Sequence, residues 1–197
     1  MKILVVATHP DIENSRVNRV WLEALKKEKN ITVRFLDEIY KENKIIDIEE
    51  EKRYLESADR VVFQFPFYWY TMPALMREYF DKTLEYGWAY GPNGDALKGK
   101  EFLVAISVGA PEYSYIGGGY NNFTITELLR PLEATANAIQ MIYLPYFALF
   151  DIPRLSDEEI KESAYKYIKY INNEDINHRK VLERLKKENK ESSFIDL

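Results

Sequence analysis

The sequence predicts an α/β protein built on a five-stranded parallel sheet with helices on both of its faces. Two observations support this prediction. Short apolar runs typical of buried parallel strands recur along the chain, and the segments between them are long enough to hold helices. The five runs are residues 3–7, 31–36, 61–65, 102–107 and 141–144. By analogy with other open sheets of this type, we expect the strand order 2-1-3-4-5.

The first helix is expected to follow the first strand closely. Its apolar residues are spaced so that they form one stripe, and Asn14 or Ser15 can cap its beginning. The stripe consists of Val17, Val20, Trp21, Ala24 and Leu25. The amino end of this helix should therefore point toward the loop that leaves the first strand.

Three later helices follow from similar patterns. One begins near Met72–Pro73, with proline in its first turn, and buries Leu75, Met76, Tyr79, Phe80 and Thr83. A second covers residues 124–139, where Pro131 must kink the helix or mark its true start. A third begins at the capping box Ser156-Asp-Glu-Glu159 and continues to Ile171.

After Asn172 the sequence becomes polar and charged, with only a thin apolar stripe of Ile176, Leu182 and Leu185. We therefore divide the chain into one domain over residues 1–171 and a charged helical appendage over residues 172–197. The appendage is expected to lie at the periphery or to pack on a partner subunit.

The composition limits the classes of function. A formal net charge of -5, without a basic face, argues against a nucleic-acid-binding protein. The absence of a long apolar run and of a signal-peptide pattern predicts a cytoplasmic protein that does not insert into membranes. With no cysteine and only two histidines, no metal site is expected. The 15 tyrosines, 10 phenylalanines and 3 tryptophans point to a stacking site or an aromatic interface.

The loop from His9 to Asn18 is a candidate phosphate site. Ser15, Asn18 and the backbone N–H groups at the helix start can donate to a phosphate, and His9 can add another donor. The loop matches neither the GxGxxG dinucleotide pattern nor the GxxxxGK[ST] pattern. The alternative is a capped helix in which His9 and Asn18 make only local bonds.

An aromatic loop follows the third strand. Pro66, Phe67, Tyr68, Trp69 and Tyr70 lie side by side in the sequence and offer a wall on which a planar ring can stack. The alternative is an aromatic cluster that seals the edge of the sheet. Because burial is hardest in a turn, the clustering favours the stacking site.

A glycine-rich loop follows the fourth strand. Gly109 permits close approach of the backbone to a ligand, and a phenol such as Tyr115 could bind a ligand carbonyl or a substrate. The alternative is an exposed surface loop. All three loops leave the same edge of the predicted sheet, which favours one shared site.

Over about residues 1–170, the sequence resembles the flavodoxin-like NAD(P)H:quinone oxidoreductase family. His9-Pro10 with Ser15 and Asn18 looks like the HPxxxxSxxN phosphate loop of that family. Further similar segments are Phe65-Pro-Phe-Tyr-Trp-Tyr-Thr-Met-Pro-Ala-Leu-Met-Arg77, Gly87-Trp-Ala-Tyr-Gly91 and Leu97-Lys-Gly-Lys100. Leu129-Arg-Pro-Leu-Glu-Ala-Thr135 and Leu144-Pro-Tyr-Phe-Ala148 resemble the branch that contains the ancillary proteins of glutathione-gated potassium efflux systems.

The resemblance implies a homodimer with a flavin in each of two shared sites. FMN is the favoured flavin and FAD the alternative, with NAD(P)H as the electron donor. It further implies that the nicotinamide passes a hydride to flavin N5 and leaves, and that a quinone or similar electrophile then takes its place. Two alternatives are a redox-sensing regulatory subunit that docks peripherally on a potassium efflux transporter, and a one-electron carrier of flavodoxin type.

The resemblance also implies roles for individual residues. His9, Ser15 and Asn18 would hold the phosphate. Pro66, Phe67, Tyr68, Trp69 and Tyr70 would contact the flavin ring together with Val108 and Gly109. Tyr115 would be the catalytic residue that stabilises charge on the reduced flavin.

Two positions depart from the family pattern. Asn121 stands where mammalian-type members have a histidine, which argues against a Tyr-His proton relay. Ser107-Val108 replaces the usual threonine pair, so ring contacts at this point are expected to rest on backbone N–H groups.

Overall fold

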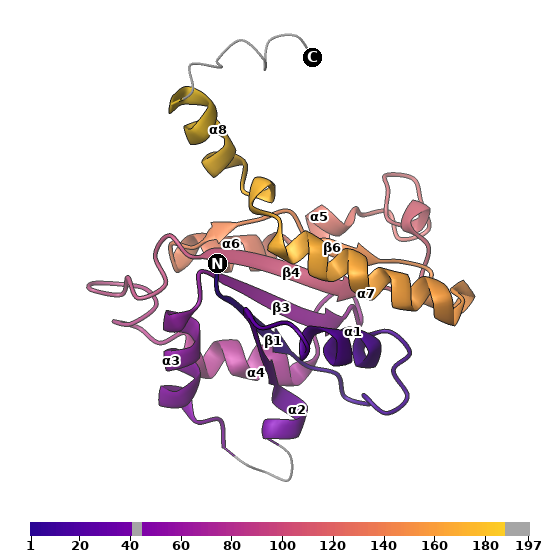
Figure 1. The fold of residues 1–197 in the computed structure, drawn as a ribbon, viewed down its shortest axis with the longest axis horizontal. Helices are drawn as coiled ribbons and strands as arrows, with labels where there is room; N and C mark the ends of the chain where they lie inside the picture. Colours follow the sequence, from indigo (N-terminus) through magenta and orange to yellow (C-terminus); the bar gives the residue numbers. More distant parts are fainter. Residues whose placement is uncertain (41–44, 188–197) are drawn as a thin grey trace.

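A parallel sheet forms the centre of the computed structural model, which describes residues 1–40 and 45–187 (Figure 1). Its strands follow the order β2-β1-β3-β4-β5, which confirms the predicted order, and a sixth strand, β6, also pairs with β4. The strands are β1 (Ile3–Ala7), β2 (Ile31–Phe35), β3 (Arg60–Pro66), β4 (Glu101–Ser107), β5 (Ile142–Tyr143) and β6 (Phe147–Leu149).

The last edge of the sheet differs from the single strand predicted over residues 141–144. Both β5 and β6 pair in parallel with β4, at Glu101–Phe102 and at Ala105–Ser107 respectively. The Leu144 N–H still donates to the Phe102 carbonyl at 2.8 Å, but Pro145 follows directly and has no N–H to continue the ladder. The predicted fifth strand is therefore present as β5, and the sequence analysis missed the sixth strand, β6, which begins two residues after Pro145.

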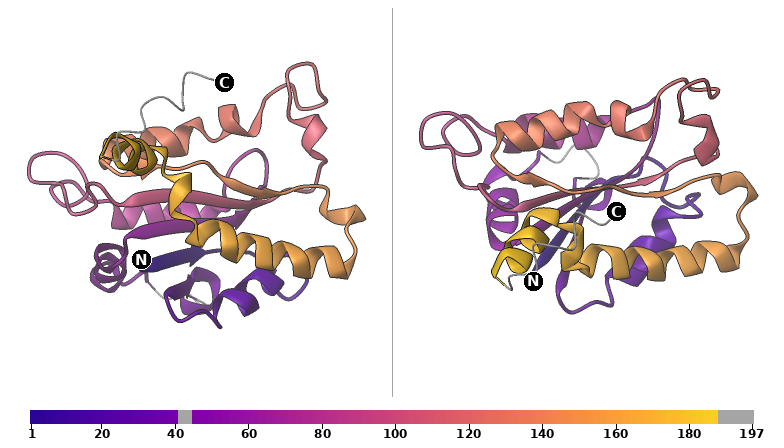
Figure 2. Two further views of the ribbon diagram at one scale, coloured as in Figure 1. Left: turned by 45° about the horizontal axis from the view of Figure 1, so that its top comes forward. Right: turned by 90° about the horizontal axis from the view of Figure 1, so that it is seen from above.

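Helices cover both faces of the sheet, as the apolar runs predicted (Figures 1 and 2). Alternate residues of β1 enter two different cores: Leu4 and Val6 enter one, and Ile3 and Val5 enter the other. One face is covered by α1 (Asn18–Leu25) and α7 (Asp157–Asn172). The other is covered by α2 (Leu36–Ile39), α3 (Ile48–Ser57), α4 (Ala74–Thr83), α5 (Ile125–Leu128) and α6 (Arg130–Ala138).

The helix ends follow the local signals with one difference. The Ser15 hydroxyl accepts the N–H of Asn18, the first residue of α1, whereas the Asn14 amide bonds Asp11 instead. The capping box of α7 forms as predicted, and α4 begins directly after Pro73. The helix predicted over residues 124–139 is divided at Leu129, so Pro131 marks the first turn of a second helix, α6.

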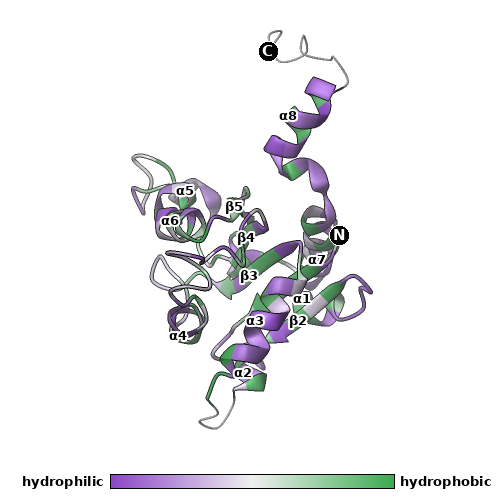
Figure 3. Ribbon diagram, turned by 90° about the vertical axis from the view of Figure 1, so that its left-hand side faces the viewer, coloured by the Kyte–Doolittle hydropathy of each residue, from purple (hydrophilic) through white to green (hydrophobic). Residues whose placement is uncertain are grey.

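The C-terminal helix α8 (His178–Lys187) projects from the rest of the molecule (Figures 1 and 3). It is preceded by a short 3-10 turn, Glu174–Ile176, and Ile176 is buried against the α7 side of the sheet. Leu182 is 43% exposed, so the predicted apolar stripe is only partly covered. Residues 188–197 of the predicted appendage lie outside the described residues.

None of the described helices has both the length and the apolar character needed to cross a lipid bilayer.

A buried ion pair links the first part of the sheet to the C-terminal segment. Arg60 in β3 and Glu101 in β4 are paired neighbours with side chains 0% and 1% exposed, and the Arg60 Nε donates to Glu101 Oε2 at 2.7 Å. The other carboxylate oxygen accepts from Asn177 at 2.6 Å and lies 2.7 Å from the ammonium of Lys180. Burial raises the pKa of Glu101, but these hydrogen bonds and charges outweigh it and the pKa is lowered overall.

We predict that Glu101→Ala lowers the free energy of unfolding by about 3–5 kcal/mol, because it leaves Arg60 buried without its counter-ion. Because the pKa of Glu101 is lowered in the fold, its contribution is present at neutral pH and is lost as the pH falls through that lowered pKa. Urea unfolding at neutral and acidic pH measures both effects. Glu85→Ala, which removes an exposed partner of Lys52, is the control. An equal, small loss in the two variants would contradict the prediction.

Candidate functional site

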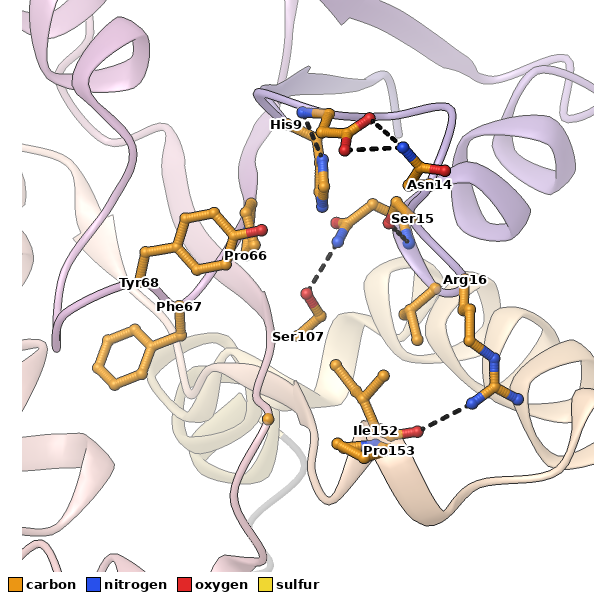
Figure 4. A pocket seen from close by; sticks show the side chains of 14 residues that line it. His9, Asn14, Ser15, Arg16, Pro66, Phe67, Tyr68, Ser107, Ile152 and Pro153 are labelled. Atoms are coloured by element: carbon orange, nitrogen blue, oxygen red, sulfur yellow. Dashed lines mark hydrogen bonds between the residues drawn. The ribbon is translucent and has the colours of Figure 1, made fainter.

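A cavity of about 520 Å³ lies at the carboxyl ends of β1, β3 and β4 (Figure 4). It is at the switch point of the sheet, where the chain passes from β2 on one side of β1 to β3 on the other, the usual place for ligands in such folds. Its lining comes from the three predicted loops and from the segment after β6. The lining residues are His9, Asp11, Asn14, Ser15, Arg16, Val17, Asn18, Pro66, Phe67, Tyr68, Ser107, Gly109, Ile152 and Pro153.

The loop after β1 is held in place by Asp37, a residue that the sequence analysis missed. The Asp37 carboxylate accepts the hydroxyl of Thr8 at 2.6 Å and the N–H of His9 at 2.8 Å. Asp37 lies in α2, directly after the neighbouring strand β2. An acidic residue just after a strand at this sheet edge was the available signal. We call residues 9–17, which form most of the predicted phosphate site, the phosphate loop.

His9 presents a neutral ring to the cavity. Its Nδ1 accepts the N–H of Asp11 at 3.1 Å, so the proton of the neutral ring is on Nε2, which can donate to a ligand (Figure 4). Burial lowers the pKa of His9 below 6.5, against the opposing charges of Asp37 and Asp11.

Hydrogen-bond donors gather at the start of α1. The N–H groups of Arg16 and Val17 make no backbone-to-backbone hydrogen bond within the part of the chain that the structure describes. Because Ser15 accepts from Asn18, its hydroxyl hydrogen remains available to a ligand at the positive end of the helix. Such a set of donors is typical of anion sites at helix amino ends, and we call it the candidate anion site.

Asn18 lies beneath this anion site and joins three elements. Its Nδ2 donates to the Ser107 hydroxyl at 2.8 Å, and its Oδ1 accepts from the Gln64 amide at 3.2 Å. The side chain is 2% exposed and is used chiefly to hold α1 against β3 and β4. The sequence analysis did not give Gln64 and Ser107 this role, although polar residues in the carboxyl ends of apolar strands are a usable signal.

The aromatic loop divides into two parts. Pro66, Phe67 and Tyr68 line the cavity, whereas Trp69 and Tyr70 do not. These two residues form the tip of a tight turn, with φ of 48° and 64°, closed by two hydrogen bonds between Tyr68 and Thr71. Such values are rare for aromatic residues and cost about 1–3 kcal/mol each. The turn leaves Trp69 90% exposed.

The glycine-rich loop contributes Gly109, but Val108 and Tyr115 do not line the cavity. Val108 is buried and its N–H donates to Leu149 in β6 at 2.8 Å, so the backbone donor expected here is already used. Tyr115 packs near Phe67, with ring centroids 6.1 Å apart. Burial, with the nearby Tyr70, raises the pKa of Tyr115, so its phenol keeps its proton at neutral pH.

Asn121, which stands where mammalian-type members have a histidine, contacts Tyr70. The Tyr70 hydroxyl donates to Asn121 Oδ1 at 3.1 Å. Tyr70 therefore bonds Asn121 and lies near Tyr115, without the imidazole of the mammalian-type pattern.

Comparison with known proteins agrees with the architecture. A family model described as a flavodoxin-like fold matches residues 1–171. The chain belongs to this family.

Two curated relatives match over most of their length. The NAD(P)H oxidoreductase YdeQ of Bacillus subtilis, itself called uncharacterized, is 47% identical over 95% of both chains. The glutathione-regulated potassium-efflux system ancillary protein KefG of Cronobacter sakazakii is 35% identical, over 86% of this chain and 92% of its own.

Two solved structures are also similar. The general stress protein 14 of Treponema denticola, in complex with FMN, has a TM-score of 0.83 and is 36% identical, over 87% of this chain and 98% of its own. An NADPH-quinone reductase from P. pentosaceus has a TM-score of 0.78 and is 31% identical, over 88% of this chain and 99% of its own.

We predict that His9 titrates below pH 6.5 and that inorganic phosphate raises its pKa, because an anion beside Nε2 favours the imidazolium. Between pH 6.5 and the lowered pKa, the unfolded chain binds the proton more readily, so the folded state loses stability as the pH falls. Proton NMR titration of the two histidines measures the pKa, and His9→Gln assigns the signal. A pKa at or above 6.5 without added anion would contradict this account of His9.

Proposed function

We propose that the protein is an FMN-dependent NAD(P)H oxidoreductase that passes two electrons to quinones or similar electrophiles. The observation that carries the proposal is one cavity whose lining combines the donors at the start of α1 with the apolar and aromatic residues Pro66, Phe67 and Tyr68. Its volume of about 520 Å³ lies within the range of small-molecule and cofactor sites. The names of the oxidoreductase, FMN-bound and quinone reductase relatives support the same function.

The anion end fits the phosphate of FMN. The hydroxyl of Ser15, the N–H groups of Arg16 and Val17, and Nε2 of neutral His9 are the donors for its oxygens. Asn18 would act mainly by positioning this loop on Gln64 and Ser107. Phosphate binding is therefore assigned to a preformed set of neutral donors and a helix dipole.

The other end fits the flavin ring. Pro66, Phe67 and Tyr68 offer an apolar wall (Figure 4), and Gly109 also lines the cavity. A Cβ added to Gly109 would meet no other atom within 4 Å, so a side chain there would occupy space in the cavity. The glycine thus preserves the room that a planar ring requires.

Bound FMN would supply a ring that accepts a hydride from NAD(P)H at N5 and passes it to the acceptor. The chain's own residues would bind and orient this ring and hold the two substrates over it in turn. Tyr115 is the proposed catalytic residue. As a neutral phenol beside Phe67, it can donate a hydrogen bond where negative charge develops.

The surface beside the cavity suits a second copy of the chain. Trp69, Tyr120 and Phe123 are exposed by 90%, 89% and 56%. Exposed aromatic residues of this kind are typical of protein interfaces. We therefore propose a cytoplasmic homodimer in which a second subunit covers the turn at Trp69 and Tyr70 and contributes to each site, so that these two residues act as ring contacts or support such contacts in the assembly. Val108, which is buried with its N–H bonded to Leu149, would only support the neighbouring Gly109.

A second candidate function is a redox-sensing ancillary subunit of a potassium efflux transporter. Its support is the 35% identity to KefG. Co-purification with a transporter expressed from the same genome, and its dependence on the flavin redox state, would separate this function from a free-standing enzyme.

We predict that the purified protein is yellow, releases FMN on denaturation and oxidises NADPH or NADH in the presence of benzoquinone. Gly109→Val should fold but bind FMN more weakly, because its side chain occupies the ring end of the cavity. Gly117→Val is the matched control, since it adds the same atoms in open space outside the cavity. A colourless wild type that binds neither FMN nor FAD on reconstitution would refute the proposal.

We predict that Tyr115→Phe slows reduction of the bound flavin by about tenfold or more, with little change in FMN affinity, because the variant loses only a hydroxyl donor. Stopped-flow absorbance in a single turnover measures the step. Tyr165→Phe, which alters a phenol that is 69% exposed on α7 and does not line the cavity, should leave the rate unchanged. Equal rates in all three proteins would remove Tyr115 from the site.

A further inference from the structure

Arg16 ties the phosphate loop to the opposite wall of the cavity. Its guanidinium donates to the carbonyl oxygens of Ile152 at 3.2 Å and Leu155 at 2.7 Å, and to the Asp157 carboxylate at 2.9 Å. Arg16, Ile152 and Pro153 all line the cavity, and Figure 4 shows the guanidinium reaching the Ile152 carbonyl. These contacts close the space between the loop and the segment that leads into α7.

The opposite wall is itself held in place. The N–H of Asp151 donates to Ala110 at 3.1 Å, and the N–H of Ile152 donates to Val108 at 3.4 Å. The capping box at Ser156 then fixes the start of α7. Arg16 therefore joins two anchored parts of the structure, and separating them would break its three hydrogen bonds.

The other side of the phosphate loop is closed differently. Asp11 and Asn14 both line the cavity, and the Asn14 amide donates to both carboxylate oxygens of Asp11, at 3.1 and 2.9 Å. A second phosphate leaving the anion site on this side would lie near a carboxylate, which repels it.

We propose that Arg16 is a latch that makes the cavity selective for a flavin ending in a single phosphate. This inference rests on the proposed function and identifies the chain residue that decides between FMN and FAD. Because the Asp11 side is disfavoured by charge, the second phosphate and adenosine of FAD would extend toward residues 152–155, where Arg16 makes its hydrogen bonds. FAD binding must break these charge-assisted bonds, and FMN binding leaves them intact.

The experiment compares dissociation constants of FMN and FAD for the flavin-free full chain, measured by quenching of flavin fluorescence. Wild type should bind FMN more tightly than FAD by about tenfold or more. In Arg16→Ala the dissociation constant for FAD should fall by about tenfold, because the cost of opening the latch is removed. A gain of FAD affinity cannot arise from general damage to the site.

Two further variants separate the latch from simpler effects. Arg154→Ala removes an exposed arginine from the same turn, one that pairs with Asp151 and does not line the cavity, and should keep wild-type selectivity. Arg16→Lys keeps the positive charge but cannot reproduce the planar fork that reaches several acceptors, so it should also gain FAD affinity.

Several results would overturn the latch. These are equal affinity of wild type for the two flavins, unchanged selectivity in Arg16→Ala, equal weakening of both flavins in that variant, and wild-type selectivity in Arg16→Lys. In each case FMN still binds and the proposed function stands. A wild type that binds neither flavin refutes the proposed function itself, and the latch with it.

Discussion

The parallel register of β1, β3 and β4 is the constraint on which the candidate site depends. It places Ala7 opposite Gln64, Gln64 opposite Ala105, and Pro66 opposite Ser107. The three strands therefore end close to one another, and each loop begins at the same edge of the sheet. A slip of one residue in any pair would send the strand's side chains to the opposite face and separate the loops that form the cavity.

Polar residues behind the proposed ligand contacts hold the phosphate loop and the start of α1 in place. Asp37 accepts from Thr8 and from the backbone of His9, and Asn18 joins α1 to Gln64 and Ser107. Buried hydrogen bonds of this kind are costly to leave unmade, so they hold the phosphate loop in one arrangement before any ligand arrives. An anion would then bind without the cost of ordering the loop.

The strained turn at Trp69 and Tyr70 is a second feature that is formed before any ligand binds. Two aromatic residues hold positive φ values, and one of them is 90% exposed, although burial in the core would have stabilised the isolated chain. The turn places aromatic surface beside the cavity, and the hydroxyl of Tyr70 in this turn donates to Asn121. In the proposed homodimer, the second subunit would cover this aromatic surface. In the proposed reaction, the surface would lie close to the planar rings of the flavin and its substrates.

Local patterns in the sequence were sufficient to predict five strands, a kink or helix start at Pro131 and the capping box of α7, because burial on two faces and helix capping act over a few neighbouring residues. The strand order was predicted by analogy with other open sheets. The local patterns also predicted that His9, Ser15, Phe67 and Gly109 lie at one edge of the sheet, and all four line the same cavity. Only the tertiary structure decided the two-strand edge at Pro145, the anchoring by Asp37 and the contacts of Arg16 with residues more than a hundred positions away. Those interactions depend on distances between segments remote in the chain, and no local pattern specifies such distances.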